Sequence, residues 1–165
     1  NTAAITRFPH THYDMVRLGL GLYGIDGDPK TSNRLERVHT LKARIIQIKL
    51  LSKGETVGYN RTHTLERNSR IAIINIGYAD GLMRSSGNSK HNVHLHGRYV
   101  PIIGNVCMDL TMIDITDVFA AELGDDVELF GKKVDIRSLA KINNTIPYEL
   151  LAGISTRVKK VYVRS

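Results

Sequence analysis

The sequence predicts a mainly β protein whose strands form an antiparallel barrel or sandwich. Three observations predict this class. Short strand-like runs follow one another after residue 40, polar turn signals separate them, and only one run has a clear helical spacing of apolar residues. The chain has 165 residues, of which 42% are hydrophobic and 24% charged, so it can bury a core and has the composition of a globular domain.

The first part of the chain differs from the rest. Residues 15–24 form a glycine-punctuated apolar run, MVRLGLGLYG, which is typical of a buried strand of a parallel sheet. Arg17 places a charge inside this run, and a buried arginine must be paired or must serve a ligand. We expect the run to belong to a larger unit upstream. From Ile25 to about Arg37 the composition turns polar, which indicates a linker between two units.

Residues 41–50 open the series of predicted strands. Their apolar positions alternate but change phase between Ile45 and Ile46, which predicts a bulge or a sharp bend of the kind that barrels use. Turn signals at residues 52–55, 97–98 and 124–126 separate the later runs. Those further predicted strands cover residues 70–76, 92–96, 99–103, 108–115, 127–130 and 157–163.

One helix is predicted over residues 136–142. Asp135 is placed to cap its first turn, and the apolar residues within it have helical spacing. Residues 147–151 suggest a second, short helix that begins at Pro147, since proline suits the first helical position.

Cys107 is the single cysteine, so no disulfide can form within the chain and a reducing compartment is expected. No leader-like start and no apolar run of membrane-spanning length is evident, and the chain is therefore expected to be cytoplasmic and without a membrane partner. With Val106 and Met108 beside it and no histidine nearby in sequence, Cys107 fits buried packing better than a nucleophile.

A net charge of +7 and a pI near 9.6 favour an anionic partner, such as nucleic acid, a phosphate-bearing cofactor or an acidic surface. A basic β-barrel that binds nucleic acid is the main alternative from another functional class. Aromatic residues are only 6% and rarely alternate with basic ones, which disfavours that alternative. A purely structural dimerisation domain is a third possibility.

Histidines give a weak signal for a metal site. His94 and His96 would share one face of a strand, and His91 lies close by. A zinc site needs a third or fourth ligand, and no paired cysteine or glutamate motif supplies one. No metal is therefore expected.

Two tyrosine motifs and one glycine turn stand out. Tyr59 ends the motif GETVGY at residues 54–59, and Tyr78 lies within the motif IGYADG at residues 76–81. Judged from residue type alone, each fits a half-buried tyrosine at the end of a strand. The third motif, GNVCMD at residues 104–109, is a glycine-led turn that can direct backbone N–H groups at an anion.

Taken together, these motifs resemble alanine racemases, in order and with similar intervals along the whole chain. Residues 146–150 and 157–162 are particularly similar to racemases fused behind a peptidoglycan-precursor ligase. The segments that carry the resemblance are 1–4, 15–24, 54–59, 76–81, 101–104, 106–109, 154–155 and 157–158.

The resemblance implies that the chain is the carboxy-terminal part of a pyridoxal-phosphate-dependent enzyme. This enzyme would interconvert L- and D-alanine for peptidoglycan synthesis. Residues 1–34 would be the closing segment of an amino-terminal β/α barrel, which holds pyridoxal 5'-phosphate on a lysine. Residues 35–165 would be the carboxy-terminal β domain, with an antiparallel β-barrel-like fold. The family works as a head-to-tail homodimer with an amino-acid substrate and no nucleic acid. Without the cofactor lysine, this part alone is expected to be inactive.

Site residues follow from the same resemblance. Tyr59 is similar to the base that removes the α-proton from the L-isomer, while the cofactor lysine serves the other face, because racemisation requires a base on each face. Since the ordinary pKa of tyrosine is about 10, such a base requires nearby positive charge. The remaining matches are Arg17 at the pyridine nitrogen, Thr2, Gly19 and Leu20 at the phosphate, Met108 at the substrate carboxylate with Asp109 beside it, and Tyr78, Arg84, Ile154 and Thr156 along the substrate channel.

Two positions depart from the family pattern. Many members have arginine where Asn105 stands, which changes the electrostatics expected of the outer channel. Many have tyrosine where Thr156 stands, a position that touches the phosphate and crowds the substrate side chain. A smaller residue there would admit a hydroxymethyl group, so serine racemisation is an alternative to alanine racemisation.

Overall fold

A computed structural model of the chain describes residues 1–26 and 34–163. The chain forms two compact units, Asn1–Thr40 and Leu41–Ser165, which are described in turn. No helix within the described ranges is both long enough and apolar enough to cross a lipid bilayer.

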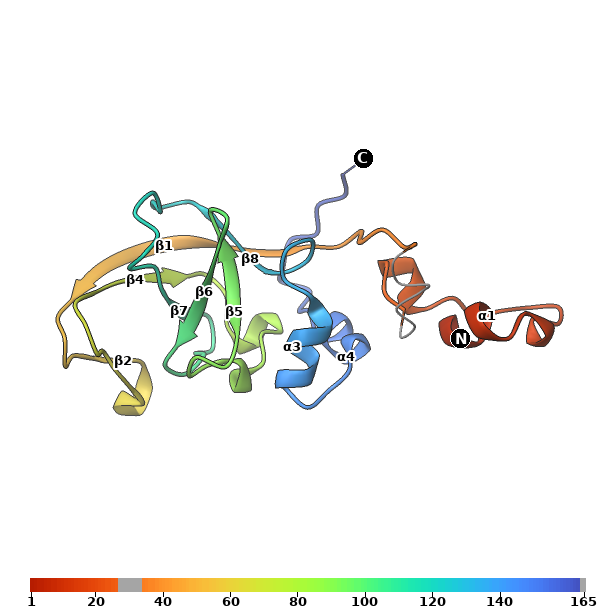
Figure 1. The fold of residues 1–165 in the computed structure, drawn as a ribbon, viewed down its shortest axis with the longest axis horizontal. Helices are drawn as coiled ribbons and strands as arrows, with labels where there is room; N and C mark the ends of the chain where they lie inside the picture. Colours follow the sequence, from red (N-terminus) through yellow and green to blue (C-terminus); the bar gives the residue numbers. More distant parts are fainter. Residues whose placement is uncertain (27–33, 164–165) are drawn as a thin grey trace. The chain divides into compact units, whose positions relative to one another are not determined.

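The second unit is a closed antiparallel barrel, which confirms the predicted mainly β class and decides between barrel and sandwich (Figure 1). Its described strands follow one another around the barrel in the order β1-β4-β7-β6-β5-β8, and β8 pairs with β1 to close it. Closure leaves no free sheet edge to attract another strand. The strands are β1 (Leu41–Leu51), β4 (Ser69–Ile74), β5 (Asn92–Leu95), β6 (Arg98–Ile103), β7 (Thr111–Asp114) and β8 (Asp126–Phe130).

Strand β1 contains the bend that its sequence predicts. Its pairing with β4 shifts register between Ile45 and Gln47, and the strict alternation of buried and exposed residues ends at the same place. Before the shift β1 pairs with β8, and from Ile45 onward with β4. A bulge bends the strand and increases its twist, so one long strand serves two neighbours around the barrel.

Inward-facing side chains fill the barrel. Seven apolar ones, one or two from each of five strands, are completely shielded from solvent, and each contributes roughly 1 to 3 kcal/mol of hydrophobic stabilisation. These seven are Ala72, Ile74, Val93, Ile102, Ile113, Val127 and Leu129.

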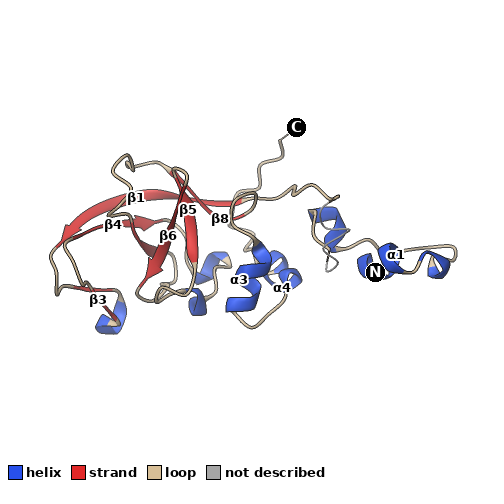
Figure 2. Cartoon of the chain, in the orientation of Figure 1, coloured by secondary structure: helices blue, strands red, loops and turns tan. Residues whose placement is uncertain are grey.

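Two short helices follow the barrel strands, as predicted (Figure 2). Helix α3 spans Ile136–Ile142, and the Asp135 carboxylate accepts a 2.9 Å hydrogen bond from the backbone N–H of Arg137, a cap that stabilises a helix by about 1 kcal/mol. Helix α4 spans Pro147–Ala152 and begins at proline. The apolar faces of both helices are buried through Ile136, Leu139, Ala140 and Leu150.

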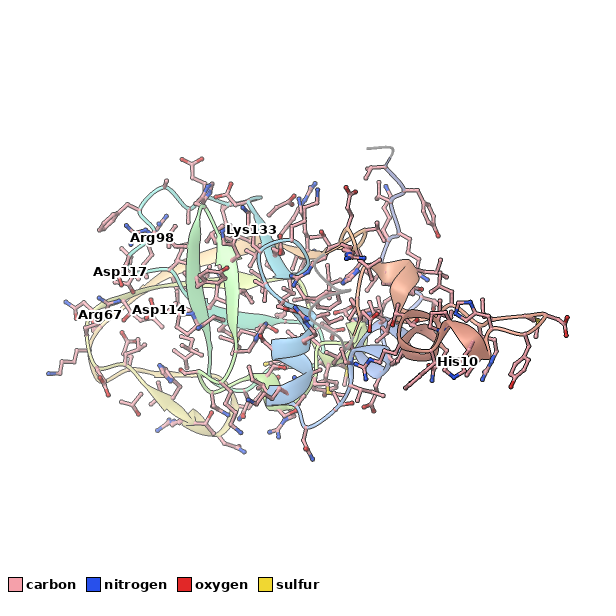
Figure 3. The ribbon with its side chains drawn as sticks, turned by 45° about the vertical axis from the view of Figure 1, so that its right-hand side comes forward. His10, Arg67, Arg98, Asp114, Asp117 and Lys133 are labelled. Carbon is pink, nitrogen blue, oxygen red and sulfur yellow. The ribbon has the colours of Figure 1, made fainter. Side chains whose placement is uncertain are left out.

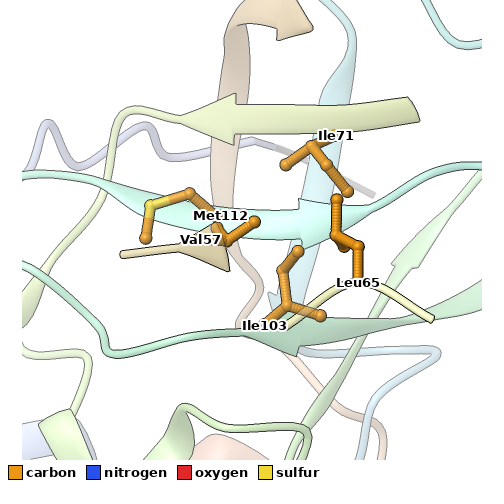
Figure 4. Close-up of a cluster of buried hydrophobic side chains, with 5 residues drawn as sticks. All are labelled: Val57, Leu65, Ile71, Ile103 and Met112. Atoms are coloured by element: carbon orange, nitrogen blue, oxygen red, sulfur yellow. The ribbon is translucent and has the colours of Figure 1, made fainter. Parts of the chain in front are cut away.

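A two-stranded excursion leaves the barrel between β1 and β4. It consists of β2 (Thr56–Val57), the single-turn helix η3 (Tyr59–Arg61) and β3 (His63–Thr64). Val57 and Leu65 from its base pack against Ile71, Ile103 and Met112 of the barrel, and Figure 4 shows these five side chains gathered between the strands. This buried cluster fixes the excursion, and therefore η3, on the barrel.

Two predicted strand ranges in the second unit need correction. The strand expected over residues 108–115 begins only at Thr111, because residues 108–109 form a bend and the carbonyls of residues 107 and 108 accept hydrogen bonds from another loop. The strand expected over residues 157–163 is wrong, since those residues have no strand structure and are largely exposed. A closed barrel offers them no edge on which to pair.

The first unit has helical turns rather than a strand. It contains α1 (Thr2–Arg7), η1 (Pro9–Thr11) and η2 (Leu20–Tyr23), so the buried strand predicted over residues 15–24 is wrong. Met15 is 80% exposed, and a parallel strand requires neighbours that the described residues of this unit do not provide. Residues 27–33 of the predicted linker lie outside the described residues.

Candidate active site

Tyr59 opens η3 at the outer end of the excursion, and its side chain is 72% exposed. It is therefore not the half-buried packing residue that residue type alone favours. Gly58 precedes it with a φ of +82°, and Asn60 and Arg61 follow with φ values of +60° and +51°. Three residues with positive φ within four positions make a tight turn, and Tyr59 is exposed on this turn rather than buried with the apolar cluster.

Asn105 anchors the backbone of this turn. Its Nδ2 donates to the carbonyl oxygen of Tyr59 at 3.2 Å, and its Oδ1 accepts from Nδ2 of Asn88 at 3.0 Å. Asn105 is only 7% exposed. The residue at this departure from the family pattern thus faces inward and anchors the backbone that carries Tyr59. Sequence reasoning missed this role because 46 residues separate the two positions.

A hollow of about 450 Å³ adjoins Tyr59. Lys49, Thr56, Cys107 and Met112 contribute to its lining. Desolvation raises the pKa of the half-buried Cys107 thiol, and the nearby Arg84 charge offsets this only in part. Cys107 is therefore a protonated thiol at neutral pH, as expected of a packing residue rather than a nucleophile.

The second tyrosine motif lies directly against the bend at residues 107–109. Tyr78 begins η4 (Tyr78–Asp80), and its backbone N–H donates to the Cys107 carbonyl at 3.0 Å. The N–H of Ala79 donates to the Met108 carbonyl at 2.9 Å. A Cβ on Gly77 would lie 2.3 Å from the Met108 carbonyl oxygen, so only glycine permits this approach.

The predicted channel residues of the second unit lie on neighbouring segments. Arg84 opens η5 (Arg84–Ser86) and lines, together with Tyr78, a second hollow of about 680 Å³. The half-buried Ile154 and the exposed Thr156 flank Ser155, whose N–H donates to the Asp80 carbonyl at 3.1 Å. The structure therefore places the segments that carry Tyr78, Met108, Asp109, Ile154 and Thr156 together.

Within the first unit, Thr2 is 4% exposed and lies next to the glycine turn. Its Oγ1 accepts hydrogen bonds from the N–H groups of Gly19 at 3.1 Å and Gly21 at 3.2 Å, and the buried Leu20 stands between these glycines in sequence. Arg17 is exposed, which corrects the expectation of an arginine buried within a strand.

The three histidines considered as metal ligands have other partners. Burial lowers the pKa of His91, whose Nε2 lies 3.1 Å from the Leu129 carbonyl oxygen. The ring of His94 contacts that of Tyr99 edge to face, and His96 pairs with Asp125 at 2.7 Å. Over residues 1–26 and 34–163, no group of three or more histidine, cysteine or acidic side chains is arranged to hold a metal ion.

A sequence profile described as "Alanine racemase, C-terminal domain" matches residues 38–162. The chain belongs to the alanine racemase family. Alanine racemase 2 of Caldanaerobacter subterraneus subsp. tengcongensis is 42% identical over 99% of this chain and 43% of its own length. The chain thus spans less than half the length of the curated racemases it matches.

Solved racemases share the fold. The biosynthetic alanine racemase of Pseudomonas aeruginosa superposes with a TM-score of 0.87 at 33% identity, over 98% of this chain and 46% of that one. The crystal structure of the Bartonella henselae alanine racemase has covalently bound pyridoxal phosphate. It superposes with a TM-score of 0.84 at 36% identity, over 91% of this chain and 42% of that one. The family resemblance seen in the motifs is therefore confirmed.

Proposed function

We propose that the chain is the carboxy-terminal part of a pyridoxal-phosphate-dependent racemase that interconverts L- and D-alanine for peptidoglycan synthesis. In this proposal residues 1–34 close the cofactor-binding β/α barrel and residues 35–165 form the β domain. The isolated part lacks the cofactor lysine and is inactive. The exposed apolar residues Met15, Leu18 and Leu22 would pack within the complete barrel. The enzyme would act in the cytoplasm.

The placement of Tyr59 is the observation that carries the proposal. A base supplied to another subunit must project from its own domain, and Tyr59 is 72% exposed at the end of an anchored excursion. We propose that it reaches the active site of the partner in a head-to-tail homodimer. There its phenol oxygen accepts the α-proton of L-alanine and returns it when the reaction runs in reverse. The lysine of the other subunit serves the opposite face.

Residues near Tyr59 would bind and orient the substrate. The bend at residues 107–109 supplies the Met108 backbone N–H for the substrate carboxylate, and Asp109 lies beside it. Met108 is 55% exposed, so this bend is available at the domain surface. Tyr78, Arg84, Ile154 and Thr156 would line the entry channel.

The first unit has donors that fit a phosphate. A hydroxyl has one proton and two lone pairs, and both acceptor positions of the Thr2 hydroxyl are used by Gly19 and Gly21. The Thr2 proton is therefore left for an anionic oxygen. The guanidinium of Arg17 would face the pyridine nitrogen and donate an N–H to it, so that nitrogen would stay unprotonated. When bound, pyridoxal phosphate supplies the electron sink that makes the α-hydrogen acidic.

The full-length protein tests this function. With pyridoxal phosphate it is expected to convert L-alanine into an equal mixture of both isomers. Chiral chromatography measures this conversion. The absence of D-alanine from a folded, cofactor-loaded enzyme would refute the proposal.

Thr156 is expected to set the tolerance for serine. Alanine should be the faster substrate, but Thr156→Tyr should lower the ratio of kcat/KM for L-serine to that for L-alanine by about tenfold, because the larger side chain excludes the hydroxymethyl group. Thr40→Tyr, the same change at another exposed threonine, serves as the control. An unchanged ratio in Thr156→Tyr would show that Thr156 does not line the substrate pocket.

A further inference from the structure

We propose that Arg157 is a positioning residue that holds the Met108 backbone N–H in register with the substrate carboxylate by clamping three loops together. This inference rests on the proposed function, since it gives Arg157 a part in the same site. Arg157 itself is not assigned a contact with substrate or cofactor.

Arg157 bridges two carboxylates that belong to different loops. Its Nε lies 2.6 Å from Oδ1 of Asp80, and its Nη2 lies 2.5 Å from Oδ1 of Asp109. Asp80 ends η4, and Asp109 directly follows Met108. One guanidinium therefore joins η4, the bend at 107–109 and the segment after α4.

Backbone hydrogen bonds complete the clamp around Asp80. Its Oδ2 accepts from the N–H of Gly77 at 2.8 Å, and its carbonyl accepts from the N–H of Ser155 at 3.1 Å. Desolvation acts to raise the pKa of Asp80, but the hydrogen bonds from Arg157 and Gly77 outweigh it, so the pKa is lowered and the carboxylate is ionised at neutral pH. Asp80 is thus a fixed anchor for one arm of Arg157.

The other arm of the clamp acts on the substrate-binding bend. The Cys107 and Met108 carbonyls are already held by the N–H groups of Tyr78 and Ala79. These bonds fix one side of the bend, and the Arg157–Asp109 contact fixes the other. Small displacements of a binding group weaken its interaction steeply, so a loosened bend should bind the carboxylate less well.

A lysine cannot replace this arrangement. The guanidinium is a rigid planar fork that donates in two directions at once, whereas an ammonium is a single point charge on a flexible stem. Arg157→Lys therefore keeps the charge but holds one carboxylate at a time. Arg157→Gln removes both ion pairs.

Arg67 offers a matched control. It forms a two-bond ion pair with Asp117, and its side chain is 55% exposed against 47% for Arg157. Figure 3 shows Arg67 and Asp117 grouped with Arg98 and Asp114 at one side of the barrel, away from helix α3. Arg67→Lys thus weakens a comparable pair, and Arg67→Gln removes it, without touching the three loops.

The experiment measures kcat and KM for L-alanine and the inhibition constant of acetate, a minimal carboxylate, in the full-length enzyme loaded with cofactor. For Arg157→Lys and Arg157→Gln we expect KM and the acetate constant to rise about tenfold, with kcat changed by less than about threefold. The Arg67 variants should match the wild type. In an Asp109→Asn background, Arg157→Gln should add little, because its effect runs through Asp109.

The outcomes separate this inference from the function. If the wild-type enzyme racemises alanine and the Arg157 variants match the Arg67 variants, the inference is overturned and the function stands. A loss of kcat at constant KM also overturns it. If Arg157→Gln fails to fold, Arg157→Lys carries the same test. A folded wild type that racemises nothing overturns the proposed function itself.

Discussion

Tyr59→Phe is expected to lower racemisation of alanine by the full-length enzyme about a thousandfold, the typical contribution of a positioned acid or base. The change removes one oxygen atom and leaves the ring. Within the described residues, no hydrogen bond uses the Tyr59 hydroxyl, and the side chain is exposed, so folding should be unaffected. Turnover is measured by chiral chromatography and the thermal midpoint by calorimetry.

Tyr99→Phe provides the control. Tyr99 is 60% exposed on β6, and its hydroxyl donates to the Lys133 carbonyl at 2.8 Å, so this change also removes one exposed phenol oxygen. It should leave turnover near the wild-type level. Near-normal turnover in Tyr59→Phe would instead favour a structural role for the excursion, such as dimerisation alone.

Gly77→Ala is expected to destabilise the protein by about 3 kcal/mol and to abolish most activity. The added Cβ would lie 2.3 Å from the Met108 carbonyl oxygen and 2.4 Å from that of Cys107. Overpacking typically costs roughly 1 to 3 kcal/mol, and separating the two segments also weakens the hydrogen bonds of Tyr78 and Ala79. Urea unfolding and steady-state turnover measure the two effects.

Gly97→Ala separates this clash from the general cost of losing a glycine. Gly97 has a φ of +77°, and a Cβ there would meet nothing within 4 Å. Its replacement should cost only about 1 kcal/mol, from the left-handed backbone, and should leave activity intact. Gly77 has a φ of −147°, which any residue adopts, so its larger cost would come from the clash. Equal effects at the two glycines would contradict the close packing of η4 on the bend.

Local patterns predicted the barrel well. The phase change after Ile45 corresponds to the bulge in β1, and Asp135 caps α3 as expected, because both features arise within a few neighbouring residues. Residues 15–24 and 157–163 were predicted as strands and are not. Their composition suits a strand, but a strand also needs a partner, and neither the closed barrel nor the described first unit offers one.

The site shows a similar division. Glycine and tyrosine motifs drew attention to the turns that carry Tyr59, Tyr78 and Met108 because such turns have local signatures. The contacts that fix those turns could not be predicted. Asn105 reaches Tyr59 across 46 positions and Arg157 reaches Asp80 across 77, and a single sequence contains no signal for such pairs. These long-range contacts hold the separate turns together in one candidate site.

The most direct test of Tyr59 as the base for one face is hydrogen exchange at the α-carbon in heavy water. With Tyr59→Phe in the full-length enzyme, L-alanine should no longer exchange its α-hydrogen, while D-alanine should still exchange through the base on the opposite face. The wild type should exchange both isomers. Continued exchange from L-alanine in the variant, at a rate near that of the wild type, would contradict the account.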